Sequence, residues 1–378
     1  QFMGWYPITP ATNLAESLNE YLPLFRKDPE TGKMTCAVVQ SEDELAAIGM
    51  AVGAGWAGLR SMTSTSGPGL SLMAEYLGLA YYTETPVVVW DVQRVGPSTG
   101  LPTRTAQGDV TQAYFNSHGD KDFVLLFPAS VTECFDFGWQ SLDLAERLQT
   151  PVIVMSDLDL GMNQWMTRKF EYPNKPMDRG KILWEKDLQD LIAKNGDWGR
   201  YKDIDGDGIP YRTVMGNLDP RSGYFTRGTG HDIYARYSED PEIWEKGMDR
   251  IKKKFETAKG LVPAPEVRSN GKAKIGIISY GSADPAVIEA QDQLLEEQGL
   301  ITDYLRIRAI PFNNDVKEFI ESHEKVYVVE MNRDGQMRQI LTIEYPELAA
   351  RMRSVCHADG LPLSARWVKQ AILEQEGK

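Results

Sequence analysis

The chain has 378 residues, enough for two or three domains at about 150 residues each. Acidic residues outnumber basic ones by 54 to 41, for a formal charge of −13, which argues against nucleic-acid binding because that depends on clustered Lys and Arg. No apolar run approaches the roughly 20 residues of a membrane-spanning helix. Three isolated cysteines, without a disulfide pattern or a secretion signal, lead us to expect a reducing cytoplasm: Cys36, Cys134 and Cys356.

Short β-rich runs alternate with longer helical patterns between residues 34 and 161. Strands are expected at 35–40, 60–65, 86–93, 122–127 and 151–156. Helices are expected at 41–57, 69–83 and 130–149. Val- and Ile-rich strands separated by helices predict a parallel sheet covered on both faces, so the fold class is α/β. Ligands bind at the carboxyl ends of the strands in such sheets, so the residues that follow each strand are the candidates.

The pattern changes after residue 168. Residues 169–271 form an extended connection rich in Lys, Asp, Pro, Tyr and Gly, with modest helices at 184–194 and 240–259. A second, smaller α/β domain is expected at 272–378. Its predicted elements are strands 274–279, 302–307 and 325–330 and helices 285–298 and 315–323.

One glycine-rich segment, GAGWAG, matches the GxGxxG pattern of dinucleotide-binding proteins through Gly53, Gly55 and Gly58. That pattern has a mechanism only in the turn directly after a strand. Here it lies deep inside a helical run rich in Ala and Gly. We therefore expect these small residues to let a neighbouring element approach closely.

Three acidic residues in a row, Glu42, Asp43 and Glu44, open the predicted helix 41–57. Ser41 and Glu44 have the spacing of a capping box, in which each side chain bonds the other's backbone amide. The alternative is a carboxylate that faces a ligand at the sheet end, where neighbouring negative charges help to raise its pKa if it is buried. On these residues alone, the capping box is favoured.

Residues 203–208 read DIDGDG and place carboxylates at alternate positions, a spacing that suits Ca²⁺. Val214 stands where an EF-hand needs its bidentate Glu. A metal loop and a plain Asp/Gly turn remain equal alternatives, with Asp203, Asp205 and Asp207 as the ligands of the former. The run GDG also begins the diphosphate–metal motif of thiamine diphosphate enzymes, but the later Asn of that motif is missing, so we reject this assignment.

Two loops after predicted strands are dense in polar groups. Residues 63–69, TSTSGPG, either hold an anion on their amides and hydroxyls or form an ordinary Ser/Gly turn. Residues 94–109, RVGPSTGLPTRTAQGD, contain Arg94 with several Thr hydroxyls nearby, a combination that suits a carboxylate clamp. The alternative for the second loop is a solvated connection.

Six motifs in order along nearly the whole chain resemble the α subunit of 2-oxoacid:ferredoxin oxidoreductases, most of all the 2-oxoglutarate type. They are WYPITPAT (5–12), QSEDELAAIGMAVG (40–53), TSTSGPG (63–69), RVGPSTGLPTRTAQGD (94–109), PVIVMSDLDLG (151–161) and VVEMNRDGQ (328–336). The resemblance implies decarboxylation of a 2-oxoacid on thiamine diphosphate, transfer of two electrons through an iron–sulfur cluster to ferredoxin, and release of an acyl-CoA, or the reverse reaction. It also implies a pyrimidine-binding domain at 1–168 and a transketolase C-terminal-like domain at 272–378.

The resemblance reverses the interpretation of Glu44. It matches the family's glutamate that contacts N1′ of the aminopyrimidine, followed by a glycine at the spacing of Gly53. Such a carboxylate favours the imino tautomer, which then removes the C2 proton of the thiazolium ring. Glu42 and Asp43 are the rival assignments.

Three further residues match substrate-binding positions of the family. Thr9 matches a hydroxyl that binds the 2-oxo or carboxylate end of the substrate. Arg94 and Thr103 match the substrate-recognising Arg and Thr of the loop after the apolar strand. An Arg offers the substrate carboxylate a bidentate contact that a Lys cannot reproduce.

The resemblance assigns Mg²⁺, the [4Fe–4S] cluster and the diphosphate motif to a β subunit, because this chain has no cluster cysteines. It implies an (αβ)₂ assembly that acts with ferredoxin, CoA and a 2-oxoacid, and a γ-type domain that is either a separate chain or removed. The 203–207 loop recurs in relatives, which favours a bound Ca²⁺ or Mg²⁺. The alternatives are the same chemistry on pyruvate, branched-chain or aryl 2-oxoacids, and a non-catalytic scaffold.

Overall fold

Seven strands form the larger of two β-sheets in the computed structural model, which describes residues 1–271 and 273–378. Their spatial order is β10-β5-β6-β4-β3-β1-β2. The strands are β1 (Phe2–Trp5), β2 (Ala37–Gln40), β3 (Ser61–Thr65), β4 (Val87–Gln93), β5 (Val124–Leu126), β6 (Pro151–Asp157) and β10 (Ala309–Ile310). The five strands expected between residues 34 and 161 are all present, which confirms the central sheet.

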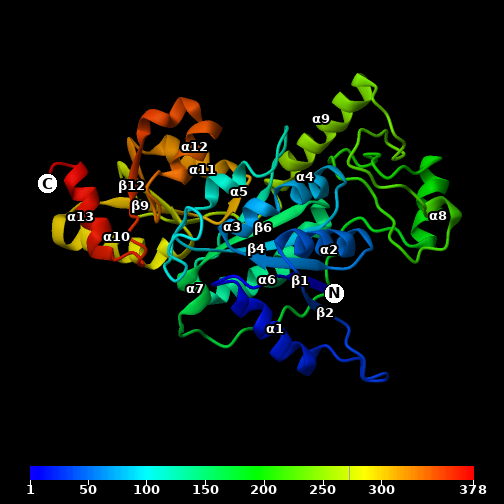
Figure 1. The fold of residues 1–378 in the computed structure, drawn as a ribbon. Helices are drawn as coiled ribbons and strands as arrows, with labels where there is room; N and C mark the ends of the chain where they lie inside the picture. The colour runs from blue at the N-terminus through cyan, green and yellow to red at the C-terminus, as the bar shows by residue number, and fades with distance from the viewer. Residues whose placement is uncertain (272) are drawn as a thin grey trace.

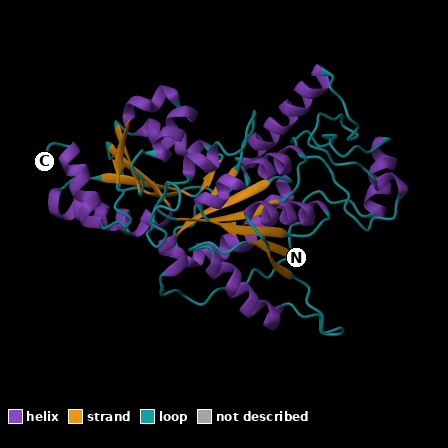
Figure 2. Cartoon of the chain, in the orientation of Figure 1, coloured by secondary structure: helices purple, strands orange, loops and turns teal. Residues whose placement is uncertain are grey.

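The centre of this sheet is the parallel pair β4 and β6, in register from Val87 opposite Pro151 to Gln93 opposite Asp157. Every residue of both strands is buried. Strands buried on both faces need helices on both faces, and Figure 2 shows helices on either side of the strands. The helices are α1 (Thr12–Phe25), α2 (Glu44–Trp56), α3 (Gly67–Leu72), α4 (Ala74–Tyr82), α5 (Val110–Tyr114), α6 (Val131–Leu148) and α7 (Leu158–Met162).

The single helix expected at 69–83 is in fact two helices, α3 and α4, separated at Met73. The amide of Met73 closes α3 on the carbonyl of Gly69, and the carbonyl of Met73 accepts from the amide of Leu77 in α4. The fully buried side chains Leu70, Met73 and Leu77 stay on the core side through the turn. The apolar spacing that predicted one helix is therefore shared by the two helices α3 and α4.

A second sheet of five strands has the order β12-β11-β8-β9-β7. Its strands are β7 (Glu266–Arg268), β8 (Ile275–Tyr280), β9 (Thr302–Ile307), β11 (Lys325–Glu330) and β12 (Met352–Cys356). Its helices are α10 (Asp284–Gln298), α11 (Asn314–Ser322), α12 (Gln336–Glu344) and α13 (Ala365–Gln375). Short 3₁₀ helices lie in this unit at Gly281–Ala283 and Pro346–Arg351, and another lies in the connection at Pro220–Ser222. The second α/β unit is thus confirmed, although Lys272, its expected first residue, lies outside the described residues.

Both sheets are parallel, as expected, except for one antiparallel edge strand in each. The edge strand β7 runs antiparallel to β9. The short strand β10, from the second unit, pairs antiparallel with β5 and so completes the larger sheet. This pairing, together with a hydrophobic core that contains both Val89 and Leu305, joins the two units into one packed body.

The connection between the units contains α8 (Glu185–Asn195) and α9 (Pro241–Ala258), as expected. Figure 1 shows both helices on one side of the larger sheet, with the second sheet and α10 to α13 on the opposite side. Ile251 and Phe255 of α9 reach the main core. Among the helices of the described ranges, none combines the length and apolar character that a membrane crossing requires.

Candidate active site

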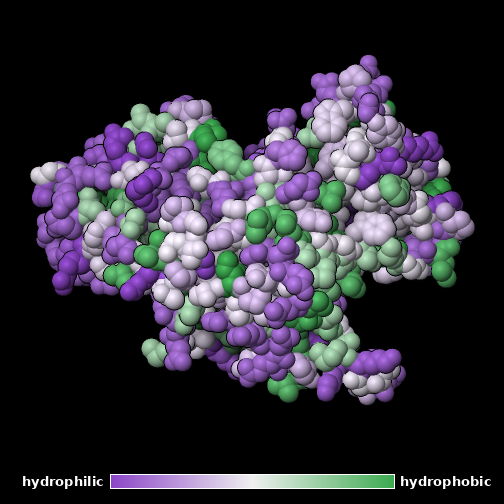
Figure 3. Space-filling model, in the orientation of Figure 1, coloured by the Kyte–Doolittle hydropathy of each residue, from purple (hydrophilic) through white to green (hydrophobic). Residues whose placement is uncertain are grey.

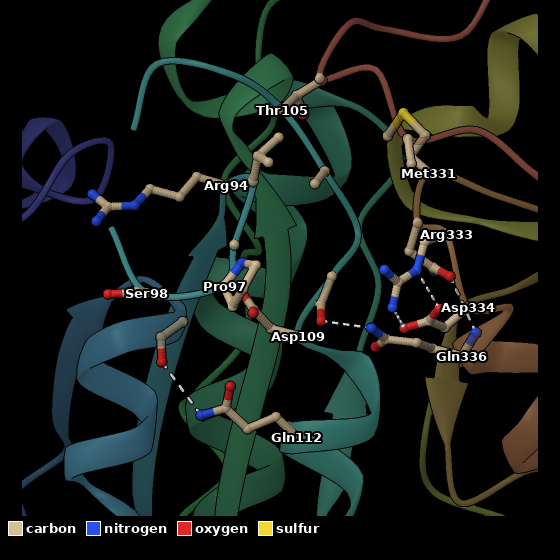
Figure 4. Close-up of a pocket in the computed structure, with 18 of the residues that line it drawn as sticks. Arg94, Pro97, Ser98, Thr105, Asp109, Gln112, Met331, Arg333, Asp334 and Gln336 are labelled. Atoms are coloured by element: carbon tan, nitrogen blue, oxygen red, sulfur yellow. Dashed lines mark hydrogen bonds and ion pairs between the residues drawn. The ribbon is translucent and has the colours of Figure 1, made fainter. Parts of the chain in front are cut away.

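A cavity of about 700 Å³ lies where the carboxyl end of the larger sheet meets the second unit. One wall is the loop 94–109 that follows β4, with the first residues of α3 beside it. The other wall consists of residues 331–336 and 357–361 from the second unit. Figure 4 shows these segments facing each other, with Arg94 and Asp109 from the first unit and Gln336 from the second. The cavity is therefore at the sheet end where the sequence predicts ligand binding.

Gln107 holds the loop 94–109 to the second unit. Its amide nitrogen donates to the carbonyl of Met331 (2.8 Å), and its Oε1 accepts from the amide of Met331 (3.0 Å). Its Nε2 donates to the carbonyl of Tyr280 (2.8 Å), and its own carbonyl accepts from Nδ2 of Asn332 (3.0 Å). The backbone N–H and C=O of Gln107 and both polar atoms of its side chain thus form hydrogen bonds with the second unit. These bonds fix the position of the loop at Gln107.

Arg94 follows β4 directly and is 7% exposed. Its Nη1 donates to the backbone carbonyl of Thr9 (2.6 Å), whereas its buried Nε has no hydrogen-bond partner among the described residues. Figure 4 shows the Arg94 side chain extending away from the loop 94–109. The structure thus brings Arg94 and Thr9 together, but through the Thr9 backbone. Thr103 is exposed and does not line the cavity.

The helix α2 is capped by Asp43, whose Oδ1 accepts from the amide of Ala46 (2.7 Å). Ser41 Oγ instead donates to the carbonyls of Trp5 and Asp43. The capping box of Ser41 and Glu44 is therefore wrong, because Asp43 already occupies the position that satisfies the first amides of the helix. Asp43 is thereby engaged in the cap, and Glu42 is exposed.

Glu44 is only 7% exposed at the start of α2. Its carboxylate forms no hydrogen bond or ion pair with the residues that the structure describes. It lies against α3, where a Cβ on Gly69 would come within 2.7 Å of Glu44 Cγ and 1.9 Å of Thr65 Oγ1. A buried carboxylate with unused acceptors and a Cβ-free neighbour is a suitable acceptor for the N–H of a heterocycle, so these residues fit an aminopyrimidine ring.

Two buried carboxyl groups, Asp91 and Asp109, are the site residues that sequence reasoning missed. Asp91 lies within β4 and Asp109 lines the cavity. Burial raises the pKa of both groups, and the charge of Asp109 raises that of Asp91 further. The available signal was an acidic residue inside the apolar strand PVVVWDVQ, since a charged side chain is rarely buried without a specific environment.

The glycines of the GxGxxG match serve packing at Gly55. A Cβ there would lie 2.1 Å from the carbonyl oxygen of Pro86, at the start of β4. The segment is inside α2 and not in a turn after a strand. The expectation that small residues let a neighbouring strand approach is therefore confirmed at this position.

The loop 203–207 binds a lysine side chain. Lys181 Nζ lies 2.7 Å from Asp205 Oδ2 and 2.8 Å from Asp207 Oδ1. Asp203 accepts from the amides of Gly206 and Gly208 instead. Within the part of the chain that the structure describes, no three His, Cys, Asp or Glu side chains form a group able to hold a metal ion. The expected ion at Asp203, Asp205 and Asp207 is thus not supported, since the Lys181 ammonium group supplies the positive charge.

The chain is similar to known proteins in sequence and in structure. A family model described as pyruvate flavodoxin/ferredoxin oxidoreductase, thiamine diphosphate-binding, matches residues 1–179. The 2-oxoglutarate synthase subunit KorA of Methanothermobacter marburgensis is 37% identical over 340 residues, which are 89% of this chain and 84% of the relative. A solved 2-oxoglutarate:ferredoxin oxidoreductase from Magnetococcus marinus is 31% identical with a TM-score of 0.86, covering 99% of this chain and 62% of that one.

A split-gene transketolase, 12% identical, covers 99% of this chain and 91% of its own with a TM-score of 0.52, which supports the fold alone. This chain spans only about 62% of the solved oxidoreductase chain, which is longer. The identity with the methanogen subunit extends over most of both proteins. The chain therefore belongs to the family of 2-oxoacid:ferredoxin oxidoreductase α subunits that includes the 2-oxoglutarate synthase subunit KorA.

Proposed function

We propose that this chain is the α subunit of an enzyme that converts 2-oxoglutarate, CoA and oxidised ferredoxin to succinyl-CoA, CO₂ and reduced ferredoxin, or runs the reverse reaction. The observation that carries the proposal is the buried carboxylate of Glu44, which has no hydrogen-bond partner among the described residues. The choice of substrate is supported by the relatives named 2-oxoglutarate synthase subunit KorA and by the solved relative with 2-oxoglutarate, coenzyme A and succinyl-CoA bound.

In this proposal Glu44 is the residue that would bind the aminopyrimidine ring of thiamine diphosphate, as the acceptor for a ring N–H. When bound, this coenzyme supplies the electron sink for loss of CO₂. With the coenzyme bound, Glu44 would hold a proton at a nitrogen of this ring. The absence of a Cβ at Gly69 leaves room for the Glu44 side chain and the Thr65 hydroxyl.

Arg94 is proposed to orient the substrate carboxylate. Its buried Nε is unused among the described residues, while its Nη1 is fixed to the Thr9 carbonyl. A guanidinium held at one nitrogen is pre-oriented, so less side-chain entropy is lost when an anion binds the rest of the fork. We further propose that Thr9 and Thr103, which are both exposed, bind the substrate with Arg94.

The partner in this proposal is a β subunit that covers the face formed by α2 and α3. Leu45 on α2 and Leu72 on α3 are exposed, and Figure 3 shows apolar side chains gathered across the middle of this face. Glu44 lies in the first turn of α2 and against Gly69 of α3, so it is close to this face. The partner would hold Mg²⁺, the diphosphate and the [4Fe–4S] cluster, in an (αβ)₂ assembly that reduces ferredoxin in the cytoplasm.

We propose that residues 1–168 bind the coenzyme ring, residues 169–271 connect the two units, and residues 272–378 support the loop 94–109 from the opposite side of the cavity. The hydrogen bonds of Gln107 to Met331 and Tyr280 support that last role. Arg94 is the first residue of this loop, so the position of the loop decides where the guanidinium group can reach.

The test is a substrate screen on the complex co-purified with its β subunit. Ferredoxin reduction is measured with 2-oxoglutarate, pyruvate, branched-chain and aryl 2-oxoacids, each with and without CoA. The proposal predicts the highest kcat/KM for 2-oxoglutarate and dependence on CoA. Turnover of another 2-oxoacid in preference would move the substrate assignment, and absence of turnover with all of them would support the scaffold alternative.

A further inference from the structure

A second cavity, of about 460 Å³, lies between the helices α2 and α4, which are neighbours in Figure 1. It shares no lining residue with the cavity at the loop 94–109. Its walls are formed by Gly49, Val52, Gly53 and Trp56 of α2, by Tyr76 and Leu79 of α4, and by residues 224–228 of the connection. The connection thus contributes directly to this second cavity.

The wall from α2 is one apolar stripe of that helix. Leu45, Gly49, Val52 and Trp56 follow one another at intervals of four, three and four residues, which places them on one side of an α-helix. Leu45 is 41% exposed, and residues 45–59 include no charged side chain. A helix that is apolar on every side is normally buried. This side of α2 is therefore expected to be covered in the assembled protein.

Gly53 leaves open space in the cavity. A Cβ at Gly53 would meet no heavy atom within 4 Å. At Gly49, by contrast, a Cβ would lie 3.1 Å from the ring of Tyr76, so that glycine is needed for the packing of α4. Glycine in the interior of a helix is unfavourable compared with residues that have a side chain. Room for a side chain of another molecule would account for the glycine at position 53.

The segment 224–228 is held against α2 and carries a cation. Trp56 Nε1 donates to Thr226 Oγ1. The guanidinium carbon of Arg227 lies 4.9 Å from the centre of the Phe225 ring and 5.6 Å from that of Tyr237. Phe225 is 67% exposed, and Arg227 Nε is buried without a hydrogen-bond partner among the described residues. The segment therefore offers an apolar surface beside an unused hydrogen-bond donor.

The charge of the cavity indicates what it binds. Arg227 is the one charged residue among those of the described chain that line it, so no carboxylate from these residues balances the guanidinium inside the cavity. Apolar walls with a single cation at the edge are complementary to an apolar side chain that lies next to a carboxylate. Arginine suits such a contact because its planar group binds a carboxylate through two N–H groups.

The position of the cavity on α2 indicates which molecule reaches it. Gly53 follows Glu44 by nine residues, which is about 13 Å along an α-helix. A stable interface covers about 800 Å² on each partner, a patch roughly 30 Å across. A β subunit that brings the coenzyme to Glu44 therefore also reaches this cavity. The exposed Leu45, one residue after Glu44, extends the same apolar stripe toward the coenzyme site.

We propose that the cavity between α2 and α4 binds a large apolar side chain of the β subunit, and that Arg227 binds a carboxylate of that subunit beside it. The inference rests on the proposed function only in taking the partner to be the β subunit that holds the coenzyme. It assigns residues 224–228 of the connection a role in assembly. These residues do not line the candidate active site.

Gly53→Leu tests the cavity by filling it. Because the space is open, the full chain should fold, and its urea midpoint should be equal or higher, since Leu favours a helix over Gly. The apparent Kd for the co-expressed β subunit, from sedimentation velocity over a dilution series, should rise by about 10–100-fold, the range for an overpacked site. Gly247→Leu, in α9 with equally open space, is the matched control and should leave Kd unchanged. An unchanged Kd in Gly53→Leu overturns the proposal.

Arg227→Glu tests the carboxylate contact, and it also decides the proposal if Gly53→Leu does not fold. It should weaken assembly by about tenfold or more at low salt, and the loss should shrink as the salt concentration increases. Arg236→Glu is the matched control, because Arg236 is exposed on the same connection and stacks on Tyr234 at 5.2 Å. Equal Kd values for the two variants at low salt overturn the contact.

The remaining outcomes separate this inference from the proposed function. If the wild-type complex assembles but turns over no 2-oxoacid, the proposed function fails, while the Kd values still decide the role of the cavity. Self-association of the full chain without the β subunit that Gly53→Leu abolishes would make a second copy the occupant and overturn the choice of partner. Normal assembly of Gly53→Leu with altered turnover would indicate a small molecule and overturn it as well.

Discussion

Gln107 and Met331 are joined by two reciprocal hydrogen bonds across the boundary between the two β-sheet units. The amide of Gln107 donates to the carbonyl of Met331 (2.8 Å), and the amide of Met331 donates to Oε1 of Gln107 (3.0 Å). Gln107 thus satisfies both the N–H and the C=O of Met331, as a residue of a neighbouring β-strand would. This contact fixes the loop that carries Arg94 against the far wall of the cavity.

Replacing Gln107 by Ala should lower stability by about 1–3 kcal/mol, because buried amide and carbonyl groups lose their partners. It should also raise KM for the 2-oxoacid, since the loop behind Arg94 loses its anchor. Urea denaturation and steady-state kinetics of the complex measure the two effects. Gln370→Ala, on the exposed side of α13, is the matched control and should change neither. Unchanged KM in Gln107→Ala would show that the loop is held by other contacts.

Glu44→Gln should reduce 2-oxoacid-dependent ferredoxin reduction by about 10²-fold or more, the usual contribution of a positioned acid–base group. The amide keeps the size of the side chain but cannot share a proton with the ring nitrogen. Assembly with the β subunit, followed by size-exclusion chromatography, should be unaffected. Glu42→Gln is the control. Glu42 is exposed and lies two residues before Glu44, so this variant should retain full activity. Full activity of Glu44→Gln would instead support the scaffold role.

Arg94→Ala should raise KM for the 2-oxoacid by about 10–100-fold, since a charge-assisted contact is worth about 1.5–3 kcal/mol. Arg94→Lys should recover only part of this loss, because an ammonium group cannot hold the Thr9 carbonyl and a carboxylate in one plane. Arg366→Ala, exposed on α13, serves as the control. Equal KM values for Arg94→Ala and wild type would exclude the clamp.

The buried Asp109 predicts the pH dependence of stability. Burial raises the pKa of Asp109 to about 7 in the folded chain, above its unfolded value. Between about pH 4 and 7 the folded state then binds more protons than the unfolded state, so stability decreases as the pH rises through this range. Asp109→Asn should flatten this decrease by on the order of 2 kcal/mol between about pH 5 and 8.

Urea midpoints at both pH values measure this effect, with Asp120→Asn as the exposed control. Asp157, whose pKa burial raises to about 6, adds a slope of the same sign to every variant. The comparison is therefore made between variants and not within the wild type. A slope that is as steep in Asp109→Asn as in wild type would contradict the raised pKa of Asp109.

The connection 169–271 is attached to the core through Glu84, a fully buried carboxylate. It accepts from Arg250 Nη1 and Lys254 Nζ of α9, each at 3.0 Å. Glu84→Gln leaves two buried cations without their counter-ion and should cost about 3–5 kcal/mol. Glu242→Gln breaks an exposed pair with Lys246 and should cost less than about 1 kcal/mol. Similar urea midpoints for both variants would mean that α9 is held by its apolar contacts alone.

The alternation of apolar strands and helices was sufficient to predict both α/β units, because it depends on local periodicity and burial. The sequence could not show that Ala309 and Ile310 pair with β5, since a two-residue strand has no periodic signal and the paired residues are far apart in the chain. It also assigned the cap of α2 to Ser41, because several polar residues in a row offer equivalent caps and only the backbone angles choose Asp43.

The candidate site was predicted in part for a similar reason. Glu44 and Arg94 belong to contiguous motifs, and the structure finds both buried at the expected sheet end. Asp109 and Gln107 acquire their surroundings from contacts between segments that are distant in the sequence. The loop 203–207 was misleading because the positive charge it binds, on Lys181, comes from a segment more than twenty residues away.

The most direct test of the account is a structure of the complex with the β subunit and thiamine diphosphate bound. It should show the Glu44 carboxylate within about 3 Å of N1′ of the aminopyrimidine ring, at the seam between the two chains. A side chain at position 44 that points away from that ring, or a coenzyme bound elsewhere, would contradict the central claim.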